Sequence, residues 1–478
     1  MAVKALFDLL AAAGSGRTPM HMPGHKRNTA LAAYLKSLGA DRDITEIPGF
    51  DNLHAPRGIL KEAMAKAAGV FQAEHTFFLV NGSTVGMLAA VRALTRPGDG
   101  ILLARNSHLC AYNAVSLNGL DPEYIYPGLS QEWQITASLS PRAVEEAILK
   151  RPFARALVIT SPTYEGVLSD LPGIIRLAQG HGIPVIVDEA HGAHLGLNPL
   201  FPDGAVKAGA DIVIQSLHKT LPSLTQTALA HVRDASLARE MQRQLGVFET
   251  TSPSYLLMAS IDGCVGLIRE RGEELFAHWG EALAAFDRLA GGLKHLQVMG
   301  YGRHHGTLPQ NIWGLDPGKL LISTLPSSMT GPGLARCLRE EWRIEPEMAL
   351  PQGVLAMTGM GDSVDTLSRL GKALREIDQR LGPREGKKAP RAMPTAQRAV
   401  PMHQAERAPF RLAAMETTSG CVCAEQLTVY PPGVPILVPG EVISPEAIDY
   451  LRAARADGAA LLGTRSQDEG FTAILQDA

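Results

Sequence analysis

The chain has 478 residues, 45% of them hydrophobic and 19% charged, which predicts two or three globular domains and argues against a disordered or fibrous protein. Its formal net charge of −3 gives no global field that would favour nucleic acid, and no apolar run approaches the roughly 18 residues that span a bilayer. Five cysteines are too few and odd in number for a secreted disulfide framework, and residues 1–14 are unconvincing as a signal peptide, so we expect a cytoplasmic protein.

Between about residues 76 and 232, short apolar runs alternate with helical stretches. Several runs are continuously apolar, as in strands that are buried on both faces. This alternation predicts a mostly parallel sheet covered by helices, in which ligands bind at the carboxyl ends of the strands. The expected strands are Phe77–Val80, Ile101–Ala104, Ala156–Thr160, Val185–Asp188, Ile212–Gln215 and Ala228–Val232, and the helical stretches include Ser83–Thr95, Pro141–Lys150 and Gly173–Gln179.

The second half of the chain predicts further domains. A long helix is expected over Ser252–Phe276 and another over Gly280–Leu293, followed by mixed strand and helix signals up to Leu381. Residues 382–409 are rich in proline, alanine and basic residues without an apolar period, which is typical of a linker. We therefore expect a major domain at 1–295, a small α+β domain at 296–381, the linker at 382–409 and a C-terminal domain at 410–478.

A polar cluster follows the expected strand Val185–Asp188, in the order Asp188-Glu189-Ala190-His191-Gly192-Ala193-His194. The sequence Asp-Glu-Ala-His also occurs in helicases that are driven by nucleoside triphosphates. Those enzymes need an upstream G-x-x-x-x-G-K-[ST] loop, which this chain lacks. A metal site formed by Asp188, His191 and His194 stays open as an alternative, although no second cluster supplies a completing ligand. We therefore expect no metal.

Binding of pyridoxal 5′-phosphate (PLP) explains more of the residues. A buried carboxylate such as Asp188 keeps the pyridine nitrogen of PLP protonated, so that the ring can act as an electron sink. The next strand leads into Ser216-Leu217-His218-Lys219, and a lysine at that place can reach the same pocket as a nucleophilic amine. Lys219 alone would more often be a surface residue, and its position after the adjoining strand is what favours a cofactor role.

The phosphate of PLP also needs a cradle. Gly82, Ser83 and Thr84 follow a strand and open a helix, whose N-terminus and hydroxyls can donate hydrogen bonds to a dianion. A hydroxyl there is also commonly just a helix cap. Ser216 and His218 could add contacts to the phosphate, and His108, in Arg105-Asn106-Ser107-His108, could stack on the ring.

With these residues assembled, the chain resembles the fold-type-I (aspartate aminotransferase-like) PLP enzymes, and specifically the ornithine/lysine/arginine decarboxylase group in its compact form without an N-terminal response-regulator-like domain. The likeness covers nearly the whole chain. Its most specific run is His218-Lys219-Thr220-Leu221-Pro222-Ser223-Leu224-Thr225-Gln226. The other matching runs are Met22–Lys26, Asp43–Glu46, Asp51–His54, Asn81–Thr84, Arg105–His108, Ser161–Gly166, Asp188–His194, Tyr430–Pro435 and Val438–Glu441.

The resemblance implies a role for each site residue. Lys219 would carry the cofactor as a Schiff base, Asp188 would pair with the pyridine nitrogen, and His108 would stack on the ring. His191 would lie near the phenolic oxygen, and Ser83, Thr84, Ser216 and His218 would hold the phosphate. The family's G-R-[IV]-[SA]-A-E stretch reads Gly420-Cys421-Val422-Cys423-Ala424-Glu425 here, so this chain lacks the cation of that arginine.

The implied reaction is decarboxylation of a basic L-amino acid through a quinonoid intermediate, as in polyamine biosynthesis, with arginine favoured over lysine or ornithine. His218 or Lys219 would return the proton to Cα, and a homodimer or higher homo-oligomer would share active sites. Another fold-type-I reaction, with Arg303 or Arg369 as the carboxylate clamp, or a catalytically silent PLP-binding regulator are the alternatives. Candidate substrate contacts are His25, Asp43, Glu46, Glu345 and Glu347.

Overall fold

The structure is a computed structural model that describes residues 5–13, 18–28, 30–31, 33–300, 308–386, 391–430, 433–466, 468 and 470–476. Arg303, Pro431 and Pro432, named above, lie outside these residues. Unit 1 comprises Met1–Leu94, Pro184–Trp279 and Gly359–Gly361, and unit 2 comprises Thr95–Ile183, Gly280–Thr358 and Asp362–Ala478. Within the described ranges, no helix is long and apolar enough to cross a membrane.

Unit 1 contains four strands of the central sheet in the order β1-β10-β9-β8, with β8 and β9 parallel and β10 antiparallel to both of its neighbours. Every residue of β8, β9 and β10 is buried, as their continuous apolar sequences predict. The elements of unit 1 are α1 (Leu6–Ala13), α2 (Ala33–Ser37), α3 (Ile59–Phe71), β1 (His75–Leu79), α4 (Gly82–Leu94), β8 (Val185–Asp188), β9 (Ile212–Ser216), α8 (Leu217–Thr220), β10 (Ala228–Val232), α9 (Ala235–Phe248) and the first part of α10 (Tyr255–Ala290).

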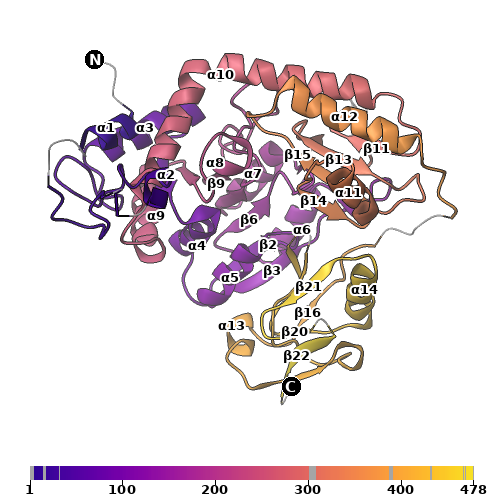
Figure 1. Cartoon of the computed structure of the whole chain (residues 1–478). Coiled ribbons are helices and arrows are strands. Elements are labelled where there is room, and N and C mark those ends of the chain that lie inside the picture. The colour runs from indigo at the N-terminus through magenta and orange to yellow at the C-terminus, as the bar shows by residue number, and fades with distance from the viewer. Residues whose placement is uncertain are drawn as a thin grey trace. The chain divides into compact units, whose positions relative to one another are not determined.

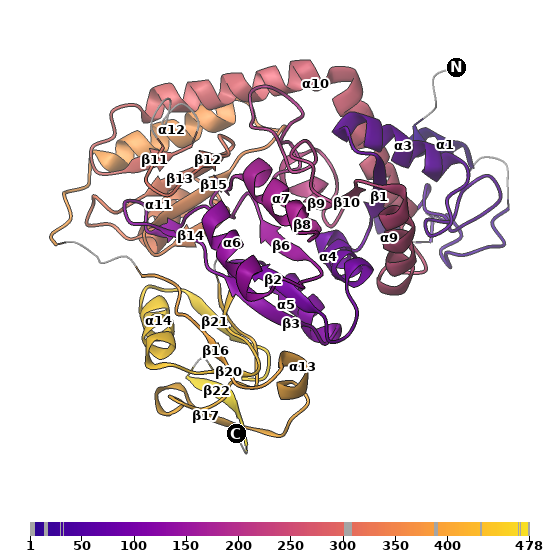
Figure 2. The same ribbon diagram turned by 180° about the vertical axis from the view of Figure 1, so that it is seen from behind.

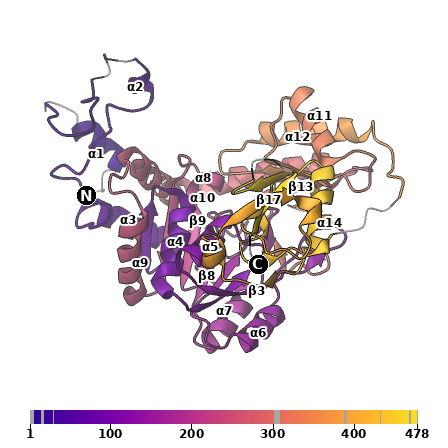
Figure 3. The same ribbon diagram turned by 90° about the horizontal axis from the view of Figure 1, so that it is seen from below.

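Helix α4 packs directly on this part of the sheet, and α9 in turn packs on α4 (Figure 3). Gly86 allows the close approach, because a Cβ at this position would lie 2.6 Å from Cδ1 of Leu79 and 3.1 Å from Cδ1 of Ile214. The N-terminus of α4 is thereby held beside the end of β1.

The first part of unit 2 contains the parallel strands β6-β2-β3, with α6 packed against β3 and α7, and the antiparallel sheet β11-β13-β15-β14, with α11 against its β14–β15 side (Figure 2). Its elements are β2 (Gly100–Ala104), α5 (Leu109–Leu117), β3 (Asp121–Ile125), β4 (Leu129–Ser130), β5 (Ile135–Thr136), α6 (Pro141–Lys150), β6 (Leu157–Thr160), β7 (Val167–Leu168), α7 (Leu171–Gly180), β11 (Gln297–Met299), β12 (Gly314–Leu315), β13 (Lys319–Ser323), α11 (Gly331–Glu340), β14 (Met348–Leu350), β15 (Gly353–Met357) and α12 (Val364–Asp378).

The C-terminal part of unit 2, drawn from orange to yellow in Figure 1, has an apolar cluster of its own that includes Leu427, Ile436 and Leu451. Helix α14 packs against the strands β19-β18-β21. Its elements are β16 (Gln397–Arg398), α13 (Met402–Ala405), β17 (Phe410–Ala414), η1 (Met415–Thr417), β18 (Leu427–Tyr430), β19 (Val434–Leu437), β20 (Glu441–Val442), α14 (Pro445–Ala456), β21 (Ala460–Gly463) and β22 (Phe471–Leu475).

The expected strands and helices of residues 76–232 are confirmed, with ends that differ by at most two residues. The expectation of two helices between residues 252 and 293 is wrong, because α10 is one continuous helix of 36 residues. Gly280 does not end it, since an interior glycine costs a helix only about 1 kcal/mol and the neighbouring Trp279 and Leu283 are fully buried. Within residues 382–409, β16 pairs with β20, and α13 packs against α5.

Candidate active site

The central cluster of unit 1 forms where the parallel strands β8 and β9 end side by side. Strand β8 ends at Asp188, whose side chain is 6% exposed and accepts a hydrogen bond from the backbone N–H of Ala190 at 3.1 Å. Strand β9 runs directly into the short helix α8, which carries Lys219. Nζ of Lys219 lies 3.0 Å from Nε2 of His191. The structure therefore brings Lys219 and His191 within hydrogen-bond distance of each other.

The loop between β1 and α4 carries the residues that the sequence predicts to form the phosphate cradle. Gly82 has φ +77°, and a Cβ at this position would meet nothing within 4 Å, so the space in front of the loop is open. Ser83 is half-buried and Thr84 is exposed in the first turn of α4. The N–H groups in the first turn of a helix lack partners within the helix, so such a helix start can bind an anion.

Two residues that the sequence analysis did not place in the site anchor this loop. The N–H of Gly82 donates to the carbonyl of Gln226 at 2.9 Å, and Nε2 of Gln226 donates to the carbonyl of Val80 at 2.7 Å. The N–H of Val80 donates to Oε1 of Glu249 at 2.6 Å, and burial raises the pKa of Glu249 to about 7. No local pattern identifies Glu249, because it acts on a loop 169 residues away.

Buried polar atoms test whether these residues suit a phosphate-bearing cofactor. Oγ of Ser216 is fully buried and has no hydrogen-bond partner among the described residues, which is rare unless a ligand supplies one. Nδ1 of His218 lies 3.0 Å from the carbonyl of Thr227 and must donate to it, which leaves Nε2 as an acceptor. Burial lowers the pKa of His218. The open glycine loop and the unpartnered hydroxyl of Ser216 fit a phosphate group, whereas the neutral His218 has no ring N–H left to donate to it.

His108 lies in unit 2, at the start of α5. It is the N-cap residue, and its Nδ1 accepts from the N–H of Cys110 at 3.3 Å. Its side chain is exposed. Arg105, three residues earlier, is fully buried.

The expected substrate contacts fall into two groups. In unit 1, Nε2 of His25 lies 3.2 Å from Oδ2 of Asp43, and Oε1 of Glu46 is buried without a hydrogen-bond partner among the described residues. In unit 2, the exposed Glu345 accepts from Nε of Arg339 at 2.6 Å, and the exposed Glu347 accepts from the hydroxyl of Tyr164 at 2.5 Å. The first group is His25, Asp43 and Glu46, and the second is Glu345 and Glu347.

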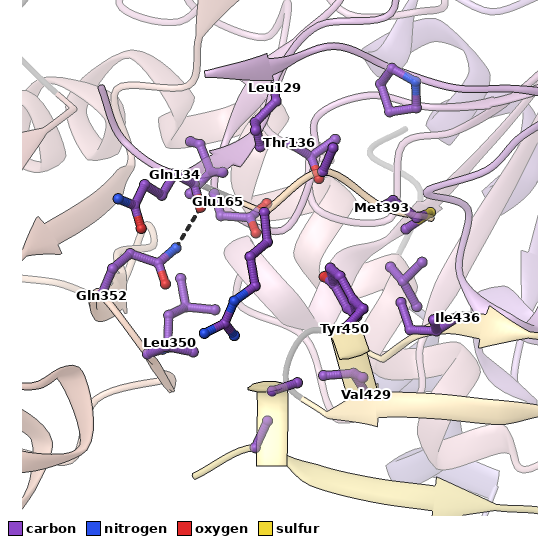
Figure 4. Close-up of a pocket in the computed structure, with 18 of the residues that line it drawn as sticks. Leu129, Gln134, Thr136, Glu165, Leu350, Gln352, Met393, Val429, Ile436 and Tyr450 are labelled. Carbon is purple, nitrogen blue, oxygen red and sulfur yellow. Dashed lines mark hydrogen bonds between the residues drawn. The ribbon is translucent and has the colours of Figure 1, made fainter. Parts of the chain in front are cut away.

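Unit 2 also contains a cavity of about 430 Å³ (Figure 4) that the sequence analysis did not predict. It lies between the β4–β5 hairpin, the β6–β7 loop and the C-terminal strands. Glu165 reaches it from the loop and Tyr450 from α14, and Nε2 of Gln352 donates to the carbonyl of Gln134 at 2.8 Å. Burial raises the pKa of Glu165, whose carboxylate accepts from Oγ1 of Thr163 at 2.9 Å.

The alternative metal site does not gain support from the position of His194. Its ring packs against Phe201 at 4.5 Å and Trp279 at 5.0 Å between centroids, in an aromatic cluster. In the part of the chain that the structure describes, no group of three or more His, Cys, Asp and Glu side chains is arranged to hold a metal ion.

The sheet, the lysine helix and the glycine loop define the α/β fold of the fold-type-I PLP enzymes. Lysine decarboxylase A from Pseudomonas aeruginosa has a similar structure, with a TM-score of 0.84 and 20% identity over 99% of this chain and 80% of that chain. The constitutive lysine decarboxylase of E. coli is similar at a TM-score of 0.82 and 19% identity, covering 98% of this chain and 82% of that one. At these identities, the likeness establishes the fold.

The family follows from the sequence comparisons. The family model "Orn/Lys/Arg decarboxylase, major domain" matches residues 6–289, and the model of the C-terminal domain of the same family matches residues 387–476. The chain belongs to the Orn/Lys/Arg decarboxylase family. It is 33% identical to an arginine decarboxylase of Bacillus subtilis (strain 168) over 90% of this chain and 89% of the relative. It is 32% identical to an arginine decarboxylase of Halalkalibacterium halodurans over 95% and 93%.

Proposed function

We propose that this protein is a PLP-dependent decarboxylase of a basic L-amino acid, with arginine the favoured substrate and lysine or ornithine the next. The observation that carries the proposal is the pairing of Lys219 with His191 at 3.0 Å, just beyond the strand ends that carry Asp188 and the unpartnered Ser216. The family membership and the relatives named arginine decarboxylase support the reaction and the substrate.

When bound, PLP would supply an electron sink for the electrons that remain on Cα as CO2 leaves. Asp188 would hold the proton on the pyridine nitrogen, and the family resemblance assigns ring stacking to His108. Lys219 would bind the aldehyde carbon of the cofactor. The phosphate would be held by the cradle residues Gly82, Ser83, Thr84 and Ser216.

Proton return to Cα is the remaining step for the protein to perform. The candidates are Lys219 and His218. Because burial lowers the pKa of His218, this imidazole is neutral at neutral pH and is a poor proton donor. We therefore assign proton return to Lys219.

The distal cation of the substrate requires carboxylates. We propose Asp43, oriented by His25, and Glu46 with its buried unpartnered oxygen as one set. Glu345 and Glu347 form the second set, although both are exposed and already have partners. A second subunit would complete the pocket, so that a homodimer or higher homo-oligomer is the functional unit. The predicted domain boundaries, cytoplasmic location and role in polyamine biosynthesis belong to the same proposal.

The test is turnover by the purified protein supplied with PLP. L-arginine, L-lysine and L-ornithine are offered separately, and mass spectrometry measures agmatine, cadaverine and putrescine. We expect agmatine to accumulate fastest. Borohydride reduction should fix the cofactor to the peptide that contains Lys219.

Two controls separate the cofactor from the reaction. Lys219→Ala should abolish both amine production and the borohydride-fixed label, whereas Lys207→Ala, a change in an exposed-face ion pair with Asp203, should alter neither. If borohydride fixes the cofactor to the Lys219 peptide but no amine is produced, the decarboxylase proposal is contradicted and transamination is the reaction to test next. Absence of the label would contradict the assignment of Lys219.

A further inference from the structure

Two runs that match the family, Arg105–His108 and Val438–Glu441, lie far apart in the sequence, yet an ion pair joins them within unit 2. The side chains of Arg105 and Glu441 are both fully buried, and Nη2 of Arg105 lies 3.2 Å from Oε2 of Glu441. A buried ion pair of this kind is seldom worth its desolvation cost for stability alone, which makes a specific role worth seeking.

Arg105 uses nearly all of its donors on the C-terminal strands and on α5. Nη1 donates to the carbonyl of Pro435 at 2.6 Å and to the hydroxyl of Tyr112 at 2.8 Å, and Nη2 donates to the carbonyl of Ile436 at 2.9 Å. The hydroxyl of Tyr112 then donates to the carbonyl of Arg105 at 2.6 Å. Both the side chain and the backbone of Arg105 are therefore fixed.

The C-terminal side is equally rigid. Oε2 of Glu441 accepts from the N–H of Val438 at 2.9 Å, and the carbonyl of Glu441 accepts from the N–H of Cys423 at 2.8 Å. Gly440 precedes it with φ +90°, and a Cβ there would lie 2.1 Å from the carbonyl oxygen of Val400. The turn that presents Glu441 thus admits only glycine at this position.

The loop that Arg105 opens is short and leads directly to His108. The N–H of Arg105 donates to the carbonyl of Ile125 at 2.8 Å, the N–H of Ser107 donates to the carbonyl of Ala104 at 3.0 Å, and α5 starts after His108. Because only Asn106 and Ser107 separate the clamped residue from His108, a shift of Arg105 must move the imidazole.

We propose that Glu441, acting through Arg105, is a positioning residue that fixes the His108 loop, so that the C-terminal domain sets the geometry of the ring-stacking residue. This inference rests on the proposed function for the identity of the stacked ligand. The ion pair of Arg105 with Glu441 and the hydrogen bonds of Arg105 to the C-terminal strands lie within unit 2 and do not depend on the cofactor.

The test compares Glu441→Gln with Glu425→Gln. Glu425 is also a fully buried carboxylate of the C-terminal domain, but it accepts from the N–H groups of Ala473 and Ser466 and does not contact Arg105. Hydrogen–deuterium exchange of residues 105–117 should become faster in Glu441→Gln and stay unchanged in Glu425→Gln. The visible circular dichroism of bound PLP should change in the first variant alone.

Turnover then distinguishes positioning from general damage. Glu441→Gln should lower kcat about tenfold with little change in KM, because small displacements of catalytic groups have effects of this order. In a His108→Phe background, the same change should lower kcat less than about twofold, since the two residues act as one unit. Tyr112→Phe, which removes the two hydrogen bonds between this hydroxyl and Arg105 without isolating a buried charge, should show a weaker form of the same pattern.

The inference is overturned if Glu441→Gln and Glu425→Gln change exchange and circular dichroism alike, or if the effects on kcat multiply fully in the His108→Phe background. If the wild-type protein makes no amine but exchange of residues 105–117 still responds only to Glu441→Gln and Tyr112→Phe, the positioning role stands and the proposed reaction fails.

Discussion

A buried chain of hydrogen bonds in unit 1 shows how single residues respond to pH. His231 lies between Oγ1 of Thr76, 2.9 Å from its Nδ1, and Oε1 of Gln215, 3.0 Å from its Nε2. Nε2 of Gln215 donates to the buried Glu189 at 2.7 Å. Burial lowers the pKa of His231 to about 3, so the folded protein keeps this imidazole neutral where an unfolded chain would protonate it.

The sign of the pH effect follows. Above pH 6.5 the neutral histidine is present in both states, and as the pH falls from 6.5 towards 3 only the unfolded chain takes up the proton. The contribution of His231 to stability should therefore fall by about 1.4 kcal/mol per pH unit in that window. Relative to His231→Asn, the wild-type free energy of unfolding in urea should drop by about 2 kcal/mol between pH 7.5 and 5.0.

Glu189 opposes this trend, because burial raises its pKa to about 8, but it is present in both proteins and cancels in the difference. A pH-independent difference for His231→Asn would contradict the neutral assignment.

The site residues that sequence could identify are those that follow strands. Asp188 and Lys219 could be proposed because continuous apolar runs indicate buried strands, whose carboxyl ends are where such sheets bind ligands, whereas the role proposed for His191 came from the family resemblance. Glu249 and Glu441 could not, because they act on segments 169 and 336 residues away and their role exists only after folding. Cys421, where the family has arginine, packs against the C-terminal apolar cluster.

At the scale of elements, α4 shows that packing outweighs helix propensity. An alanine normally stabilises a helix interior by about 1 kcal/mol relative to glycine. At Gly86, however, the added methyl would lie 2.6 Å from Leu79 and 3.1 Å from Ile214, in the layer between α4 and the sheet. We predict that Gly86→Ala destabilises the protein by about 1–3 kcal/mol in urea unfolding.

Gly263→Ala is the matched control. Gly263 lies inside α10, is exposed, and has nothing within 4 Å of a built Cβ, so this change should stabilise by up to about 1 kcal/mol. Because α4 begins at the phosphate cradle, Gly86→Ala should also weaken PLP binding. Equal effects of the two alanines on stability would contradict the packing argument.

Helix α10 marks the limit of predicting elements from sequence. Gly280 suggested a break between two helices, yet the helix continues because Trp279 and Leu283 are buried on either side of it. The short strands β16 and β20 are a similar case. Each of these strands has only two residues and therefore no periodic signal. Only the pairing of β16 with β20 shows that part of residues 382–409 is structured.

At the scale of the whole molecule, the proposed shared active site makes a prediction about mixed subunits. The resemblance places the segment around His25 in a pocket shared with a second subunit, whereas Lys219 would belong to its own subunit's site. His25→Ala and Lys219→Ala should each be nearly inactive alone. In a mixed dimer, one site would carry both lesions and the other would carry neither.

Co-expression of the two variants should therefore restore activity. Random pairing makes half of the dimers mixed, and each mixed dimer has one intact site of two, so recovery should reach about a quarter of the wild-type turnover per subunit. Amine production and the mass of the purified oligomer would be measured together. Mixing two Lys219 variants, Lys219→Ala and Lys219→Gln, is the control and should restore nothing. A mixed dimer of native mass without recovered activity would place His25 and Lys219 in the same subunit's site and contradict sharing.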